Sequence, residues 1–161
     1  CDFLNDNKKE NSLKYYFTPP WAKMIKRDLI FKNNIKFDEI IASNDVMFSL
    51  KAASFAIRIK ACQDILYVIT LSRGSVTQII SKTHFNSKFK TALNANKLLC
   101  SIGMRRYQQS ILYFLGKSYK FGFQYVIYVI IQVIKNRANI FIGMSKVFRP
   151  KQTLKIRENK K

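Results

Sequence analysis

The clearest helical pattern in the first half of the chain lies between residues 45 and 56. Apolar side chains there recur at the three- and four-residue intervals of an amphipathic helix. Ser43, Asn44 and Asp45 come directly before them and supply side-chain oxygens that can accept hydrogen bonds from a first helical turn. The pattern therefore predicts a helix over residues 45–56. A shorter helix is predicted over residues 29–33, with Asp28 as its cap.

Two segments that follow this helix have the pattern of β-strands. Residues 57–61 alternate between apolar and polar positions, and residues 65–71 form a run of β-branched and aromatic residues of strand length. Gln63 and Asp64 lie between them and suit a turn. Residues 72–77 form a small-residue break that predicts a loop leaving the second strand. We expect an α/β fold from this order of elements.

The second half of the chain contains three apolar segments. Helices are predicted from about residue 88 to Gly103 and from residue 105 to 115, where Gly116 is expected to end the helix. Residues 123–134 are almost continuously apolar but too short to span a bilayer, which needs roughly 20 residues. This segment is either a core element or an element lying against a membrane.

Charge is distributed unevenly along the 161 residues. The chain carries 29 Lys and Arg against 9 Asp and Glu, a net charge of +20, and no acidic residue occurs between Asp64 and Glu158. Such a field attracts polyanions, whether nucleic acid, an anionic bilayer or a diphosphate ligand. A merely solvated basic surface is the alternative.

Cysteine and histidine content excludes several classes of site. The three cysteines are widely scattered without a CxxC pair, which argues against a disulfide framework or a zinc site. His84 is the only histidine, so multi-histidine metal centres are excluded, and the sequence offers it no convincing Cys or Ser partner for a catalytic triad. The first dozen residues also lack the pattern of a secretory signal.

Domain boundaries are predicted from Pro19 and Pro20, from the helical second half and from the basic tail punctuated by Pro150. The predicted division is a segment over residues 1–18, a portion over 19–82, a helical region over 83–148 and a basic tail over 149–161.

Three places offer candidate chemistry. Asp45 at a helix start is either a carboxylate base or part of a helix cap. Arg73 and Ser75 flank Gly74, a combination that suits a phosphate contact or a tight surface turn. Trp21 is the only tryptophan, and it can stack on a sugar or a base or anchor a core.

The order of these pieces resembles the acceptor half of bacterial family 2 glycosyltransferases, in particular those of capsule and lipopolysaccharide biosynthesis. The resemblance covers roughly residues 15–148. It is carried, in chain order, by residues 20–23 (PWAK), 35–39 (IKFDE), 43–48 (SNDVMF), 67–70 (YVIT) and 74–77 (GSVT).

The resemblance implies a GT-A fold and transfer of a sugar, with inversion, from a nucleotide-diphosphate donor to a polysaccharide or lipid-linked acceptor. It implies that Asp45 is the catalytic base, because a sugar hydroxyl is a poor nucleophile until its proton is taken. The other substrate-binding positions that it implies are Trp21 and Lys23 in the sugar and acceptor cleft, Asn44 in the same motif as Asp45, and Arg73, Ser75 and Thr77 on the loop near the diphosphate.

One part of the family pattern is missing from the sequence. The nucleotide-binding half and its DxD motif do not precede Trp21, so residues 1–18 are interpreted as the remainder of that half, and the chain alone is expected to be inactive. The complete enzyme is expected to use Mg or Mn held mostly by the missing half, which can be a separate chain. The expected location is the cytoplasmic face of the bacterial membrane. The alternative function is a basic helical module that binds nucleic acid or an anionic membrane, although no helix-turn-helix, RRM or zinc pattern supports nucleic acid.

Overall fold

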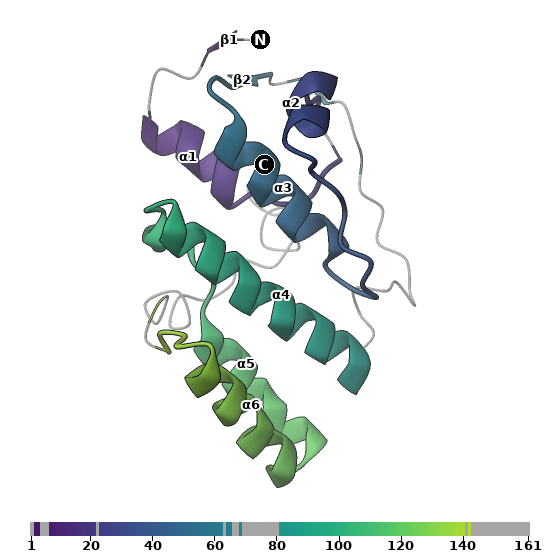
Figure 1. Ribbon diagram of the computed structural model, residues 1–161, viewed down its shortest axis with the longest axis vertical. Helices are drawn as coiled ribbons and strands as arrows, with labels where there is room; N and C mark the ends of the chain where they lie inside the picture. Colours follow the sequence, from purple (N-terminus) through teal and green to yellow (C-terminus); the bar gives the residue numbers. More distant parts are fainter. Residues whose placement is uncertain are drawn as a thin grey trace, which may run out of the picture. The chain divides into compact units, whose positions relative to one another are not determined.

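The computed structural model describes residues 2–3, 7–21, 23–62, 64–65, 68, 81–140 and 142, and helices make up most of them (Figure 1). The chain divides into two compact units, Cys1–Tyr107 and Gln108–Lys161. Each unit has its own packing and is described separately.

The first unit is built around one helix, α3 (Asn44–Phe55), which contacts α1, α2 and α4 (Figure 1). This helix confirms the predicted one over residues 45–56. The other elements of the unit are α1 (Asn7–Tyr15), α2 (Arg27–Lys32), α4 (Lys82–Ser101), the 3-10 helix η2 (Arg105–Tyr107), β1 (Asp2–Phe3) and β2 (Lys60–Ala61).

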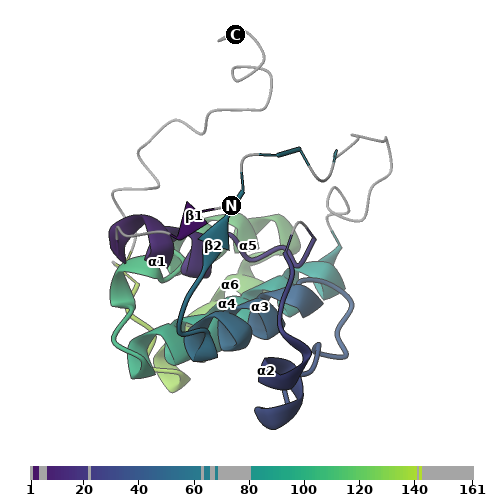
Figure 2. The same ribbon diagram turned by 90° about the horizontal axis from the view of Figure 1, so that it is seen from above.

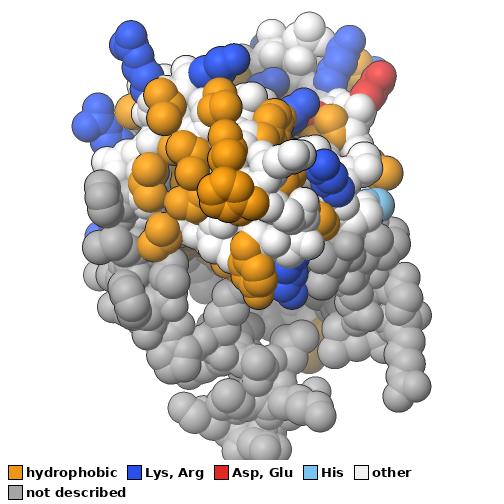
Figure 3. Space-filling model, turned by 90° about the horizontal axis from the view of Figure 1, so that it is seen from below, with side chains coloured by type: hydrophobic (Ala, Val, Ile, Leu, Met, Phe, Trp, Pro, Cys, Tyr) orange, Lys and Arg blue, Asp and Glu red, His pale blue; other side chains and the backbone are white. Residues whose placement is uncertain are grey.

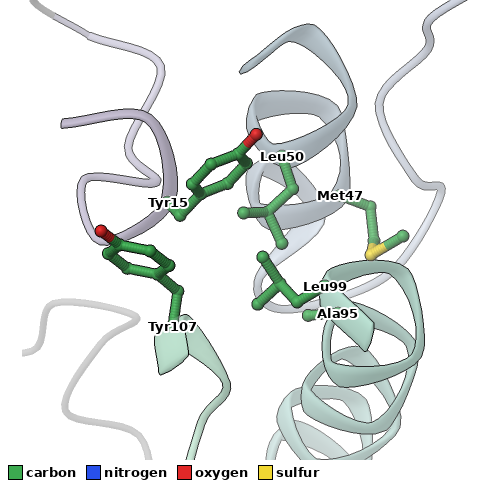
Figure 4. Close-up of a cluster of buried hydrophobic side chains, with 6 residues drawn as sticks. All are labelled: Tyr15, Met47, Leu50, Ala95, Leu99 and Tyr107. Carbon is green, nitrogen blue, oxygen red and sulfur yellow. The ribbon is translucent and has the colours of Figure 1, made fainter. Parts of the chain in front are cut away.

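Six buried side chains form the main core of this unit (Figure 4). Leu50 of α3 and Leu99 of α4 are each only 1% exposed, and Ala95 beside them is fully buried. Burial of such aliphatic side chains is the main stabilising term in folding. The full set is Tyr15, Met47, Leu50, Ala95, Leu99 and Tyr107.

A smaller cluster joins α2 to α3. Phe48 and Ala52 of α3 are buried together with Ile35, and Leu29 and Ile30 of α2 pack against them. The predicted cap of α2 is wrong in detail, because the helix starts at Arg27 after Lys26 and Asp28 lies inside its first turn.

Capping interactions determine where α4 begins and where it ends. At its start, the Ser81 hydroxyl accepts a hydrogen bond from the amide of His84 at 3.1 Å, which is a typical N-cap. At its end, Gly103 has a φ of +75°, and the amides of Gly103 and Met104 donate to the carbonyls of Cys100 and Leu99. This is a Schellman motif, and it confirms the predicted helix end near Gly103.

The second unit contains α5 (Ile111–Ser118), the 3-10 helix η3 (Tyr119–Phe121) and α6 (Phe123–Lys135), which pack against one another. The predicted helix over residues 105–115 is wrong in its bounds. Residues 105–107 form η2, and α5 continues past Gly116, because a glycine ends a helix only where the backbone turns left-handed. Gly122, with a φ of +93°, is the residue that separates η3 from α6.

The expected α/β fold, a partial GT-A sheet, is wrong for the described residues, which are mostly helical. The only strands described are β1 and β2, which pair antiparallel with Asp2 opposite Ala61 and Phe3 opposite Lys60 (Figure 2). The alternation over residues 57–61 thus yields a two-residue strand, because a strand extends only as far as a partner continues. Of residues 65–71, only Ile65 and Val68 are described, and neither is in a strand.

Within the described ranges, no helix combines the length and the apolar character needed to cross a bilayer.

Candidate functional site

The candidate site begins at the amino end of α3. Asn44 and Asp45 are the first two residues of this helix, so the Asp45 carboxylate lies in its first turn. A negative side chain there is stabilised by the helix dipole. Ser43 occupies the N-cap position in the left-handed region, with φ 64° and ψ 31°, and its side chain makes no capping hydrogen bond. The predicted cap is therefore not formed by Ser43.

The loop before α3 is fixed by backbone hydrogen bonds. The amide of Asp38 donates to the carbonyl of Asn44 at 3.3 Å, and the amide of Ile40 donates to the carbonyl of Asp38 at 2.9 Å. Phe37 stacks on Phe48 of α3, with ring centroids 3.9 Å apart and planes at 7°. These contacts hold both ends of the loop against α3, so Asn44 and Asp45 have a defined position.

A second group of candidate residues lies in the segment after α1. The rings of Phe17 and Trp21 meet edge to face, with centroids 5.5 Å apart. The ammonium of Lys23 donates a hydrogen bond to the carbonyl of Phe17 and lies 5.0 Å from the centre of its ring. Trp21 is 37% exposed, so it is not the core anchor that one interpretation of the sequence predicted.

Lys23 and Asp45 link these two groups. Half-burial lowers the pKa of Lys23 from its ordinary value, and the negative charge of Asp45 opposes part of that decrease. The two side chains are therefore close enough to interact electrostatically. The structure thus places Lys23 within electrostatic range of Asp45, and the Lys23 ammonium also lies over the Phe17 ring that meets Trp21.

The remaining predicted site residues, Arg73, Ser75 and Thr77, lie outside the described residues, as does the loop over residues 72–77. Phe17 was not predicted from the sequence. The sequence feature that could have indicated Phe17 is the run of three aromatic residues, Tyr15, Tyr16 and Phe17, before Pro19. Such a run is more typical of an ordered segment than of a linker.

The described part of the chain contains no group of three or more His, Cys, Asp or Glu side chains that could hold a metal ion. Within the described residues, Asp38, Glu39 and Asp45 therefore do not form a three-ligand metal group.

The described residues offer three chemical functions in one region. The Asp45 carboxylate can accept a proton from a hydroxyl group, and the Lys23 ammonium can donate hydrogen bonds to an oxygen ligand. The Trp21 indole, with Phe17 behind it, can cover the apolar face of a sugar ring. This set suits a neutral, hydroxyl-rich ligand.

Comparisons of the chain with protein-family models, with curated proteins and with solved structures found no match.

Proposed function

We propose that this chain is the acceptor-binding part of an inverting glycosyltransferase that uses a nucleotide-diphosphate sugar. The observation that supports the proposal is the electrostatic interaction between Lys23 and Asp45, two residues that the resemblance to family 2 transferases assigned to one site. They are separated in the sequence by the whole of α2 and the loop that follows it. A purely capping role for Asp45 does not require a lysine within electrostatic range.

In the proposed reaction, Asp45 is the catalytic base. The acceptor hydroxyl gives its proton to the Asp45 carboxylate while its oxygen attacks the anomeric carbon of the donor sugar. The bond from that carbon to the diphosphate breaks, and the nucleoside diphosphate leaves with the bonding electrons. Attack from the face opposite the leaving group inverts the configuration at the anomeric carbon.

The neighbouring side chains position the acceptor. Lys23 holds the Asp45 carboxylate electrostatically and donates to acceptor oxygens, and Asn44 offers an amide for a further hydroxyl group. Trp21 stacks on the acceptor ring, and Phe17 supports the indole from its edge.

Donor binding is assigned by resemblance alone. Arg73, Ser75 and Thr77 are proposed to contact the diphosphate, and the nucleotide and the divalent cation are proposed to bind a nucleotide-binding half on a separate segment or chain. When bound, that cation supplies positive charge that neutralises the leaving diphosphate.

Acceptor binding can be measured on the chain itself, because Trp21 is its only tryptophan and reports directly on the site. Titration with a panel of oligosaccharides should give a saturable change in Trp21 fluorescence for at least one of them. Lys23→Met should weaken that binding by about tenfold, the effect of losing a hydrogen bond to a charged group. Lys36→Met, which removes an exposed lysine from the loop before α3, is the matched control and should bind normally.

The transfer step is tested by measuring the release of nucleoside diphosphate from the donor. For this assay the chain is expressed as one polypeptide with any nucleotide-binding segment that the same gene encodes. Asp45→Asn should abolish transfer and keep the Trp21 response to the acceptor, whereas Asp38→Asn should retain both. Absence of any saccharide response, or undiminished turnover in Asp45→Asn, would overturn the proposal.

A further inference from the structure

Helix α6 exposes a continuous apolar stripe on one side. Five large side chains, spaced at intervals of three, four and one residues, are between 42% and 78% exposed. At about 100° per residue they fall within an arc of about 100° on the helix surface. These residues are Phe123, Ile127, Ile130, Ile131 and Ile134.

The stripe is not the surface through which α6 packs. The buried residues of the helix are Tyr125, Val129 and Val133, which lie on the opposite side at the same angular spacing. Helix α6 is therefore apolar on both sides. A contiguous exposed apolar surface of this kind marks an interaction site, since it is unfavourable in water.

Basic residues border the stripe at both ends. Lys117 and Lys120 precede α6, Lys135 is its last residue and Arg137 follows it, and all four side chains are exposed. The Lys117 ammonium donates to the hydroxyl of Tyr113 at 2.7 Å and lies 4.5 Å from the centre of that ring. Figure 3 shows a face of the molecule on which hydrophobic side chains gather, with Lys and Arg side chains at its edge.

We propose that α6 binds the surface of an anionic lipid bilayer and lies parallel to it. Its apolar stripe enters the boundary between headgroups and acyl chains, and the four basic residues contact lipid phosphates. The helix has 13 residues, or about 20 Å at 1.5 Å per residue, and cannot cross a hydrocarbon core of about 30 Å.

The charge of the chain favours a bilayer over a second copy as the occupant. Each copy carries a net charge of +20, and no acidic residue lies between positions 65 and 157, so a second α6 would place like charges against each other. An anionic bilayer supplies both the apolar phase and the opposite charge. This proposal does not depend on the proposed transferase activity.

The test is co-sedimentation of the whole chain with lipid vesicles. Vesicles of phosphatidylcholine with about one third phosphatidylglycerol should bind the chain at least about tenfold more strongly than vesicles of phosphatidylcholine alone. The double variant Ile127→Gln/Ile131→Gln should lose at least about tenfold in affinity, because two aliphatic groups no longer enter the lipid. Its circular dichroism should be unchanged, since both side chains are exposed.

The matched control is Phe31→Gln/Ile57→Gln, which replaces two exposed apolar residues of the first unit. Its vesicle binding should equal that of the parent chain. Equal binding to the two kinds of vesicle, or an equal loss in the two double variants, would overturn the proposal. Sedimentation equilibrium without lipid gives a further check, because self-association abolished by Ile127→Gln/Ile131→Gln would make the stripe an interface between copies and would also overturn it.

Discussion

The hydroxyl group of Ser87 makes two hydrogen bonds to one residue, Ala42. It donates to the carbonyl oxygen of Ala42 at 2.8 Å and accepts from the amide of Ala42 at 3.3 Å. Ser87 lies on α4, and Ala42 lies two residues before the start of α3. One side chain therefore fixes the backbone that leads into the candidate site.

Replacing Ser87 with alanine should destabilise the protein by about 1–3 kcal/mol, because both backbone groups of the buried Ala42 lose their partner. Urea unfolding followed by circular dichroism measures the change. Ser101→Ala is the control, since the exposed Ser101 hydroxyl donates only to Leu98 of its own helix. Equal losses in the two variants would show that the link between Ser87 and Ala42 is not important.

Truncation of Leu99 tests the main core. Leu99→Ala should lower the free energy of unfolding by about 2–5 kcal/mol, because it leaves a cavity between α3 and α4. Leu13→Ala, at a position 41% exposed, should cost much less. Thermal denaturation of both variants gives the comparison, and similar melting temperatures would contradict the assignment of this core.

The left-handed backbone at Ser43 predicts a specific order of tolerance. Ser43→Gly should be close to neutral, because glycine adopts this conformation without a steric penalty. Ser43→Val should destabilise by at least about 1–2 kcal/mol, since a β-branched side chain clashes there. Chemical unfolding of the two variants distinguishes them, and a more stable Ser43→Val protein would contradict the observed φ.

The pH dependence of stability should show a contribution from Tyr15. Burial, then the charge of Glu10 and then Tyr107 raise the pKa of Tyr15 above its ordinary value of 10.0. The folded state therefore keeps a proton that the unfolded state loses, and this stabilisation is complete below pH 10 and decreases as the pH rises through the folded-state pKa.

Comparison with Tyr15→Phe isolates that contribution from other groups that titrate at high pH. The variant should lose less stability than the parent chain between about pH 9 and pH 11.5, as measured by urea midpoints across that range. Parallel curves for the two proteins would show that Tyr15 does not titrate differently on folding.

The sequence predicted correctly those elements that depend on residues close together in the chain. Helix α3 follows from its apolar spacing, and the end of α4 follows from Gly103. The start of α4 was predicted about six residues too late, because its first turns are polar and are fixed by the bond between Ser81 and His84. Helix α1 was not predicted at all, since its residues are mostly polar and one ion pair, Glu10 to Lys14 at 2.6 Å, supports it.

The candidate site was predicted in part and for a similar reason. Asp45 and Asn44 are recognisable at a helix start, and Trp21 stands out as the only tryptophan. The contacts among Phe17, Trp21 and Lys23 depend on the path of the chain around Pro19 and Pro20, which no periodic pattern encodes. The α/β prediction failed because alternation describes only the faces of a strand and not whether a partner strand pairs with it.

The aromatic contact between Tyr15 and Tyr107, whose ring centroids are 5.5 Å apart, has a consequence for synthesis on the ribosome. Tyr15 and Tyr107 close the core from the two ends of the first unit, so this core is complete only after translation has passed residue 107. Translation from the end of α3 at Phe55 to residue 107 takes roughly 3–10 seconds at about 5–20 residues per second, and the side of α3 that packs on α4 is incompletely covered during that time. Nascent chains stopped before η2 should therefore be protease-sensitive, and those extended past it should be resistant.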